Sequence, residues 1–324
     1  MDKSWFVIVN PTAGSGRGER DWPEIMALFR KHGIKFEFAF TQRKHHAVEL
    51  AVLAIRKGNR QIICVGGDGT LNEVVNGIFI QRVVPTTDVT IAVVAVGTGN
   101  DWARTFTVIG DYEQNVKYIR DGKTFLQDVG KVDYFEARIK HSRYFANAAG
   151  IGFDAEVALT TNALKEEGEQ GRFLYLLSIL KTLVAYRPSV AKVQIDSHSY
   201  GGLVFSATLG IGKYNGGGMM QVPNATPNDG MLEVTLIQKV NRFSVLRNIF
   251  RLYNGNILKH PKIFGYQARQ MRVTSKPPFN LEVDGESLGT SPFVFSVVPQ
   301  GIRVVVGADF KLVGGPQTAI YSED

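Results

Sequence analysis

The sequence predicts an α/β domain followed by an all-β domain. In the first part of the chain, short apolar runs alternate with segments of helical period, as they do in βαβ units. After about residue 126 the pattern changes to period-two alternation between turn residues, which is typical of an antiparallel β-sandwich. The length of 324 residues suits two domains, each with its own core. We therefore expect domains at 1–126 and 127–308, and a segment 309–324 that packs back on the first domain.

The N-terminal domain is predicted from apolar runs that lead into glycines. Gly33 and Gly58 each follow a segment of helical period, where glycine commonly ends a helix. Several of the predicted strands run directly into glycine-rich loops, and open α/β sheets bind ligands outside the carboxyl ends of their strands. The expected strands are 5–9, 35–40, 61–65 and 90–95, and the expected helices carry Trp22, Ile25, Met26 and Phe29 on one side or span 47–57.

The C-terminal domain is predicted to consist mostly of strands, with two helices among them. The second of these helices has Arg247 and Arg251 on one side and an apolar row on another. That apolar row either lies at a membrane surface or packs on the β domain, and the sequence leaves both open. The apolar row is Phe243, Leu246, Ile249, Phe250 and Tyr253; the helices are 172–186 and 242–254, and the strands are 192–196, 203–210, 232–237, 271–274, 280–283, 293–298 and 302–306.

The cysteine content and the apolar runs indicate a cytoplasmic protein. Cys64, the single cysteine, has no partner for a disulfide or a shared metal, which favours a reducing compartment. The chain begins with only a short apolar run before a glycine-rich loop, unlike an export signal. The longest apolar stretch, 173–186, contains Lys181 and is shorter than the roughly 20 residues that cross a bilayer.

The charge distribution favours an anionic partner. The net charge is +7, and the segment 234–281 contains basic residues but no Asp or Glu. Anionic lipid headgroups attract such a segment, which predicts peripheral attachment at the inner face of the membrane; a merely solvated basic face is the alternative. Nucleic acid is not an expected partner, because no binding motif with interleaved aromatic residues accompanies the charge. The basic residues are Lys239, Arg242, Arg247, Arg251, Lys259, Lys262, Arg269, Arg272 and Lys276.

The strongest functional signal is the stretch Val65-Gly-Gly-Asp-Gly-Thr-Leu-Asn-Glu-Val-Val75, in which a strand leads through glycines into a helix. Glycines let backbone amides approach phosphate oxygens, and the helix N-terminus adds a partial positive charge. Asp68, inserted among those amides, is suited to handle Mg²⁺ beside the phosphates. The alternative is an Asp-Gly turn that only connects the strand to the helix.

Two further loops accompany this stretch. Residues 9–18 follow the first strand and are rich in glycine, but they lack the Gly-Lys-Ser/Thr ending of a P-loop and alone indicate no more than a turn. Residues 94–104 follow the fourth strand and carry Thr98 and Asp101. Because Asp68 and Asp101 follow adjacent strand ends, we expect them to hold one metal-water cluster.

Together the three loops resemble those of the diacylglycerol kinase catalytic-domain family, which includes bacterial lipid kinases and sphingosine kinases. The similarity extends over nearly the whole chain. It implies an N-terminal domain like that of phosphofructokinase and NAD kinase that binds ATP, a C-terminal domain that contributes to the lipid site, and phosphate transfer to a lipid hydroxyl. The residues that this similarity places at the nucleotide are Asn10, Pro11, Thr12, Ala13, Gly14, Thr41, Gly67, Asp68, Gly69, Thr70, Leu71, Asn72, Glu73 and Thr98.

The resemblance also assigns roles in the second half of the chain. Asp154 lies in a segment similar to one that borders the cleft in the family. The stretch 214–232 is similar to a segment that binds a structural Mg²⁺ in bacterial members. Here that metal would be held by the Asp229 carboxylate and the backbone carbonyls of Thr226 and Met231, and a plain hairpin turn is the alternative.

The general base is assigned to Glu286 by the same resemblance. A carboxylate within hydrogen-bond reach can accept the proton of a lipid hydroxyl, while Asp68 and Asp101 organise the catalytic Mg²⁺. The alternative for Asp284-Gly285-Glu286 is a hairpin turn with an exposed glutamate. His45 and His46 are expected to be solvated.

Three functions fit parts of this pattern. NAD kinases and phosphofructokinases also carry a Gly-Gly-Asp-Gly-Thr loop, but the loops at 96–101, 216–219 and 284–286 together favour the lipid kinase. A catalytically silent regulator that binds nucleotide or lipid would not require all of Asp68, Asp101 and Glu286. Diacylglycerol, phosphatidylglycerol, a monoacylglycerol and a sphingoid base all fit as the acceptor, and a homodimer would be ordinary.

Overall fold

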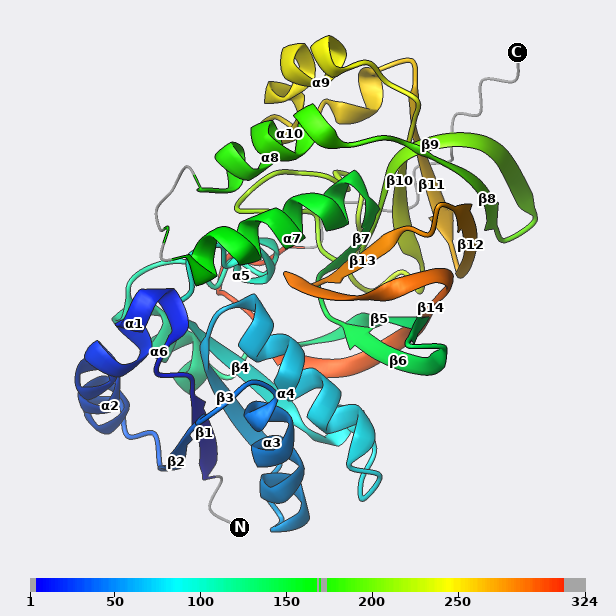
Figure 1. Ribbon diagram of the computed structural model, residues 1–324. Helices are drawn as coiled ribbons and strands as arrows, with labels where there is room; N and C mark the ends of the chain where they lie inside the picture. Colours follow the sequence, from blue (N-terminus) through cyan, green and yellow to red (C-terminus); the bar gives the residue numbers. More distant parts are fainter. Residues whose placement is uncertain (1–3, 168, 170–173, 312–324) are drawn as a thin grey trace.

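The computed structural model describes residues 4–167, 169 and 174–311 (Figure 1). The first half of the chain contains a parallel sheet in which the strand order is β4-β3-β1-β2. Its strands are β1 (Trp5–Val9), β2 (Phe36–Phe40), β3 (Gln61–Gly66) and β4 (Thr90–Ala95). The strands predicted from the sequence are thus confirmed to within one residue at each end.

Helices cover both faces of this sheet. Right-handed crossovers place α2 on one face, where it contacts α6, and place α3 and α4 together on the other face. The central strands are buried on both faces, which is why they consist of apolar residues without alternation. The helices of this half are α1 (Ala13–Arg20), α2 (Trp22–Lys31), α3 (His46–Arg56), α4 (Asp68–Ile80), α5 (Asp101–Thr105) and α6 (Tyr112–Asp121), with a 3₁₀ turn at Thr86–Asp88.

The second half is a set of antiparallel strands, as predicted. The α/β plus β-rich fold class is therefore confirmed. The strands are β5 (Thr124–Glu136), β6 (Ile139–Phe145), β7 (Ala148–Gly152), β8 (Ser189–Ile195), β9 (His198–Gly210), β10 (Leu232–Gln238), β11 (Ile263–Ala268), β12 (Gln270–Lys276), β13 (Asn280–Val283) and β14 (Glu286–Val305). The helices are α7 (Phe153–Glu166), α8 (Leu174–Ala185), α9 (Arg242–Asn248) and α10 (Phe250–Tyr253), with a 3₁₀ turn at Ile257–Lys259.

Two long strands join the halves. β14 begins in the antiparallel part, and its end pairs in parallel with β4 through Arg303 and Val304. β5 pairs with β14 along most of this length. The boundaries at 126 and 308 stay predictions, because these strands run through both halves. Of the segment 309–324, Phe310 packs against Phe106 and Phe125, and residues 312–324 lie outside the described part of the chain.

One predicted helix is divided into two short helices in the structure. The helix expected at 242–254 is divided into α9 and α10, which meet at Ile249. The helix expected at 172–186 is α8, and its predicted first two residues lie outside the described part of the chain. In the residues that the structure describes, no helix has both the length and the apolar character to cross a membrane.

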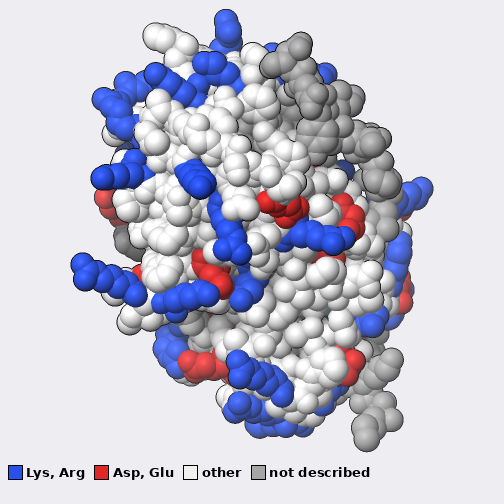
Figure 2. Space-filling view, turned by 90° about the vertical axis from the view of Figure 1, so that its right-hand side faces the viewer, with Lys and Arg blue, Asp and Glu red and all other residues white. Residues whose placement is uncertain are grey.

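Surface charge is unevenly distributed. Figure 2 shows Lys and Arg at the upper end of the molecule, where Figure 1 places α9 and α10, and the acidic side chains visible in this view lie lower. This end belongs to the segment 234–281, which lacks Asp and Glu.

A test of the β5–β6 packing uses Gly130. A Cβ at this position would lie 2.0 Å from Cζ of Phe145, which is fully buried on β6. We expect Gly130→Ala to lower the free energy of unfolding by about 1–3 kcal/mol, because the ring has no space to move into. Urea denaturation measures this. Gly201→Ala on β9, where nothing lies within 4 Å of the added carbon, is the control and should stay within about 0.5 kcal/mol of the wild type. Equal losses in both variants would contradict this packing.

Candidate active site

The three glycine-rich loops meet at the carboxyl edge of the parallel sheet. They follow β1, β3 and β4, which are neighbours, so their separation in the sequence does not separate them in space. Asn10 connects the first two loops, because its backbone N–H donates to the Val65 carbonyl at 2.9 Å and its side chain donates to the Thr70 hydroxyl at 2.9 Å. Arg17 connects the first loop to the third by donating to the Gly97 carbonyl at 2.8 Å.

The N-terminus of α4 is the part of this edge best suited to bind an anion. Gly67 precedes the helix in an extended conformation, and its backbone lies against that of Gly97. A Cβ on Gly97 would lie only 2.7 Å from Cα of Gly67, so this approach requires glycine. The exposed amides at the start of the 13-residue helix α4 can therefore face an anion, with the helix dipole adding to the attraction.

Asp68 and Asp101 are held by backbone amides at this edge. The Asp68 carboxylate accepts hydrogen bonds from the amides of Asp101 and Trp102, both at 3.1 Å. The Asp101 carboxylate accepts from the amides of Gly217 and Gly218 at 2.7 and 2.6 Å. Burial raises the pKa of both carboxyls, and the negative charge of Asp68 contributes to a pKa of about 7 for Asp101.

The donor set around these two acids fits a divalent cation. Oδ2 of Asp68 and Oδ2 of Asp101 converge beside Gly99, where an added Cβ would lie 3.3 and 3.6 Å from them. Oδ1 of Asn100 is buried nearby, without a hydrogen-bond partner in the described part of the chain, and faces Gly97 and Gly67. Paired carboxylates and an amide oxygen are hard ligands of the kind that Mg²⁺ prefers.

Asp284 joins the two halves at this site. Its buried carboxylate accepts one hydrogen bond from the Asn72 side chain of α4 at 2.8 Å. It accepts three more, at 3.0, 3.1 and 2.9 Å, from the amides of Ala146, Asn147 and Ala148. Burial raises the pKa of Asp284 to about 6 despite these donors. A single carboxylate therefore fixes the start of α4 against the strands of the second half.

Glu286 follows a tight turn that begins at Asp284. Asp284 and Gly285 both have positive φ, 47° and 88°, as the two central residues of a type I′ hairpin turn do. This turn directs Glu286 back toward the nucleotide half. Its carboxylate forms a 2.8 Å ion pair with Arg143, and both side chains are 12% exposed. The alternative of a freely exposed glutamate on a hairpin is therefore wrong.

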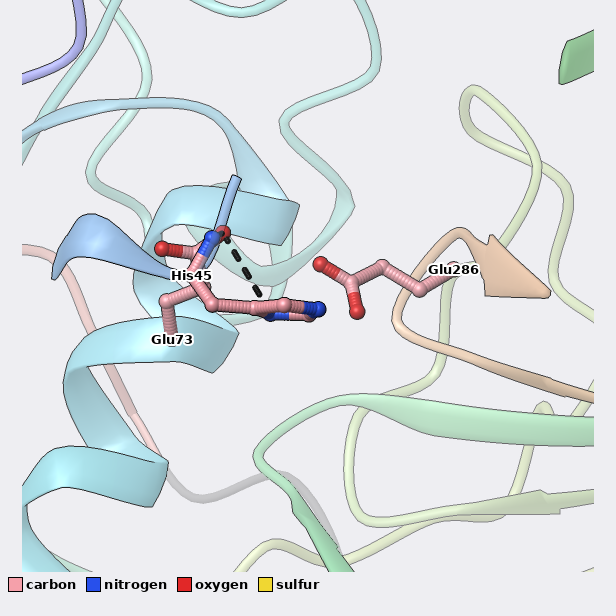
Figure 3. A group of neighbouring side chains, drawn as sticks. All are labelled: His45, Glu73 and Glu286. Carbon is pink, nitrogen blue, oxygen red and sulfur yellow. Dashed lines mark hydrogen bonds and ion pairs between the residues drawn. The ribbon is translucent and has the colours of Figure 1, made fainter. Parts of the chain in front are cut away.

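Glu286 faces residues of the first half. One ligand atom from each of His45, Glu73 and Glu286 lies within 4.8 Å of the other two (Figure 3). Glu73 accepts hydrogen bonds from the amides of His45 and Ala47, and it therefore caps the start of α3. His45 is exposed, as expected, although its Nδ1 lies 3.9 Å from a Glu73 carboxylate oxygen; His46 is half-buried and accepts a hydrogen bond from the Gln42 amide at 3.0 Å.

The residues predicted at the nucleotide lie at or beside the carboxyl edge of the sheet. Thr41 follows β2, and its amide donates to the Val9 carbonyl at 2.8 Å. Thr98 is exposed in the third loop. Two members of the set have structural tasks as well: Asn72 donates to Asp284, and Glu73 caps α3. Their contact with a nucleotide stays a prediction, as it does for the rest of the set: Asn10, Pro11, Thr12, Ala13, Gly14, Gly67, Asp68, Gly69, Thr70 and Leu71.

An apolar cavity lies in the second half. It lies between α7, α8, β9, β10 and the α9–α10 segment; its volume is about 70 Å³, and the space measures about 740 Å³ when the open solvent at its mouth is included. Its polar residues include Asp154, whose carboxylate accepts a hydrogen bond from the Thr208 hydroxyl and whose pKa is raised by burial. Tyr175, at another point of the wall, lies against Gly216, next to the amides that bind Asp101. The cavity therefore reaches the loop whose amides bind the Asp101 carboxylate.

The predicted structural metal site lies around Asp229. Glu233 lies beside it, and Oε2 of Glu233 is buried with no hydrogen-bond partner among the described residues. Burial and the charge of Asp229 raise the pKa of Glu233 to about 7. Asp128 holds the same loop by accepting from the Gly230 amide at 2.7 Å. An unpartnered carboxylate oxygen beside a second acid fits an oxygen-ligated cation.

Comparison with known proteins identifies the family. The profile of the diacylglycerol kinase catalytic domain matches residues 4–132, and that of the YegS C-terminal NAD kinase beta sandwich-like domain matches residues 147–306. A diacylglycerol kinase of Staphylococcus carnosus is 31% identical over 312 residues, which cover 96% of this chain and 97% of that protein. The chain belongs to the diacylglycerol kinase catalytic-domain family. It is therefore an enzyme, a lipid kinase.

Further members of the diacylglycerol kinase family show the same extent of similarity. A diacylglycerol kinase of Staphylococcus epidermidis is 29% identical over 310 residues, which cover 95% of this chain and 94% of that protein. A crystal structure of a diacylglycerol kinase from Bacillus anthracis superposes with a TM-score of 0.70 at 19% identity, and the match covers 96% of this chain and 98% of that one. The solved structure supports the fold, and the sequence relatives support the family.

Several residues of this lipid kinase site carry no sequence signal. Arg143 lies in an alternating strand and gives no hint of its pairing with Glu286. Glu282 accepts a hydrogen bond from the Gly285 amide, and burial raises its pKa to about 8. A Cβ on Gly150 would lie 3.1 Å from Oε2 of Glu282 and 3.5 Å from Oδ2 of Asp154, so these two acids are neighbours. No local pattern could have suggested this, because Asp154 lies at the start of α7 and Glu282 lies on β13, far along the chain.

The buried acids predict a pH dependence of stability. The folded-state pKa values of Asp101, Glu282 and Asp284, about 7, 8 and 6, exceed their ordinary values of 3.8, 4.5 and 3.8. The folded protein therefore binds more protons than the unfolded chain across this range, and its free energy of unfolding falls as the pH rises from about 5 to about 8. Urea denaturation at both pH values should show a smaller fall in Asp101→Asn, by on the order of 1 kcal/mol. An equal fall in the variant would contradict the raised pKa.

Proposed function

We propose that the protein transfers the γ-phosphate of ATP, with Mg²⁺, to a hydroxyl of diacylglycerol or a related membrane lipid. The observation that carries this proposal is the meeting of Glu286 with Glu73 of α4, the helix that begins at Asp68. Glycine turns, two metal-suited acids and a separate carboxylate are the parts that phosphoryl transfer requires.

The first half would bind the nucleotide. The amides at the start of α4 face the phosphates, and Asn10 and Arg17 keep the three loops in register through their hydrogen bonds. This arrangement supplies positioning and positive potential, which account for most of the rate enhancement in phosphoryl transfer. Asp68, Asp101 and Asn100 would hold Mg²⁺, which would neutralise phosphate charge.

Glu286 would accept the proton of the lipid hydroxyl. Arg143 orients the carboxylate by its 2.8 Å contact with Oε2, which leaves Oε1 for the substrate. Asn162 supports the turn, since its side chain donates to Ser287 at 3.3 Å and to the Gly285 carbonyl at 3.4 Å. A general base in this position contributes roughly 10²–10⁴-fold to the rate.

The apolar cavity favours a lipid over a soluble acceptor. It is lined mostly by apolar side chains, whereas a dinucleotide acceptor requires polar partners along its length. Asp154 and Thr208 provide one polar position, and Tyr175 provides a second beside the Asp101 loop. We infer that acyl chains occupy this cavity while the hydroxyl faces Glu286. NAD kinase activity and a silent nucleotide-binding role are the alternatives that turnover assays separate.

A structural Mg²⁺ is part of the proposal. Asp229 and Glu233 would hold it together with the backbone carbonyls of Thr226 and Met231. Because the substrate is a membrane lipid, the enzyme would work in the cytoplasm while attached peripherally to the inner face of the membrane. A homodimer stays a prediction.

The base assignment is tested by Glu286→Gln. We expect kcat to fall by roughly 10²–10⁴-fold, because glutamine cannot accept the proton, while the affinity for ATP stays unchanged. Labelled-ATP turnover with diacylglycerol, phosphatidylglycerol, monoacylglycerol and a sphingoid base measures this and identifies the acceptor. Glu37→Gln, an exposed glutamate near the start of β2 and so away from the carboxyl edge of the sheet, is a matched control and should retain full activity. Full activity of Glu286→Gln would remove the proposed base.

The structural metal is tested by Asp229→Asn. In the wild type, added Mg²⁺ should raise Tm, because a ligand that binds only the folded state stabilises it. Asp229→Asn should show a smaller Mg²⁺-dependent rise in Tm than the wild type, because the Asp229 site no longer contributes to it. Thermal denaturation with and without Mg²⁺, in the absence of ATP, measures this. Asp196→Asn is an unsuitable control, since Asp196 accepts from the amides of Arg269 and Gln270. Asp88→Asn in the 3₁₀ turn before β4 is a better one. An unchanged Mg²⁺ response in Asp229→Asn would contradict the site.

A further inference from the structure

The outer side of the α9–α10 segment exposes large apolar side chains. Phe243 is 85% exposed and Phe250 is 76% exposed, and Leu246 and Tyr253 are 41% and 47% exposed. The opposite side of the same segment is covered, because Val245 and other side chains pack with the small core beneath α7 and α8. Exposing two phenylalanines on one short segment is unfavourable in water, and a cluster of this kind marks a surface that binds something.

The surroundings of these side chains are basic. Lys239, Arg242, Arg247, Lys259 and Lys262 are exposed around the segment, and Arg251 lies among them. In the part of the chain that the structure describes, none of the six forms an ion pair, and Nη1 of Arg251 is buried without a hydrogen-bond partner. Figure 2 shows this end of the molecule with basic side chains in blue and apolar or neutral ones in white. The surface therefore combines apolar and cationic groups without neutralising acids.

The same segment forms a wall of the apolar cavity. Val245, Ile249 and Leu252 line the cavity from the inner side of α9 and α10. His260 lines it nearby, and the charges of Arg251, Lys262 and Arg247 help to lower its pKa after the larger effect of burial. These cations therefore lie close to the cavity wall. The exposed apolar surface and the cavity are two sides of one thin layer of short helices.

A neighbouring helix extends the apolar surface. α8 exposes Val184 at 71% and Leu177 and Leu180 at about 40% each, while Ile179 of the same helix lines the cavity. Figure 1 shows α8 directly beside α9 and α10. The outer sides of α8, α9 and α10 thus frame the cavity with apolar side chains. We name these outer sides the docking face.

We propose that the docking face binds an anionic lipid bilayer, with Phe243 and Phe250 inserted below the headgroups and the surrounding cations at the lipid phosphates. This inference rests on the proposed lipid kinase function. Charge complementarity selects the occupant, since the acid-free rim attracts phosphates, and apolar side chains rimmed by cations are the composition of interfacial membrane segments. A protein partner would need acidic groups that match six separate cations.

The position of the docking face has a consequence for substrate entry. A lipid that leaves the bilayer beside α8 or α9 can pass its acyl chains directly to the cavity side of the same helices. Water then never has to solvate the chains, so the transfer avoids the cost of exposing apolar surface. A site that opened elsewhere would require the lipid to cross an aqueous surface.

Vesicle flotation tests this proposal. The full-length protein is mixed with vesicles of phosphatidylcholine, or of phosphatidylcholine with phosphatidylglycerol. We expect the wild type to float with the anionic vesicles only, and less at high salt. Phe243→Ala/Phe250→Ala should reduce the bound fraction about tenfold, and Arg242→Glu/Lys259→Glu should reduce it by at least about fivefold for each charge removed.

Matched controls carry the same changes elsewhere. Val83→Ala/Ile139→Ala removes apolar side chains that are 54% and 62% exposed, and Arg30→Glu/Lys192→Glu reverses two exposed charges on α2 and β8. Both control variants should bind the anionic vesicles as the wild type does. Equal loss in controls and test variants would show that only net charge or hydrophobicity matters, and it would overturn the assignment of this face.

A second readout separates this proposal from the proposed function. All variants are assayed with a short-chain diacylglycerol that dissolves as monomers, where the docking-face variants should keep wild-type turnover. If the wild type shows no turnover but floats as predicted, the kinase assignment fails and the docking face stands. Two outcomes would overturn the docking face while turnover is normal: the wild type does not bind anionic vesicles, or the docking-face variants bind them as well as the wild type does. Either outcome would favour a protein partner for the exposed apolar side chains.

Discussion

The buried carboxylate of Asp284 is the contact on which the architecture of the site depends. It accepts four hydrogen bonds, one from Asn72 at the start of α4 and three from consecutive amides that lead into β7. A carboxylate away from water is unfavourable unless its oxygens are satisfied, so all four donors must stay in place together. Because Glu286 follows Asp284 by two residues across a fixed turn, the same contact holds the Glu286 side chain relative to α4.

The site contains more negative than positive charge. Burial raises the pKa of Asp68, Asp101, Asp154, Glu282 and Asp284, and within the described residues the cation that pairs with any of them is Arg104, at 3.8 Å from Asp101. Neighbouring carboxylates repel one another in a medium of low dielectric constant, so this site favours protons or cations. A divalent cation held by Asp68 and Asp101, as proposed, would relieve this repulsion and so would give the buried acids a role.

The sequence predicted elements and motifs that depend on neighbouring residues, and it missed contacts between residues that lie far apart in the chain. The parallel strands, their glycine turns and Asp68 follow from runs of neighbouring residues, and the structure places them together because β1, β3 and β4 are adjacent. Resemblance to a family was needed for Glu286. Arg143 and the bridging role of Asn72 could not be predicted, because each depends on a partner more than 140 residues away. β5 was also missed, since buried Gln127 and Asp128 interrupt its apolar pattern.

The α9–α10 segment shows that helical periodicity alone does not predict which apolar side chains are buried. A helical period indicates that one side is apolar, but it does not say which apolar residues become covered. Here the segment presents two apolar sides, one toward the cavity and one toward solvent, and Ile249 between the two short helices keeps helical backbone angles. Helices of 7 and 4 residues are too short to be stable alone, so the inner contacts must hold them in place. The same two short helices therefore carry the outer apolar side chains and part of the cavity wall, so a bilayer bound at the outer side would lie against the elements that shape the cavity.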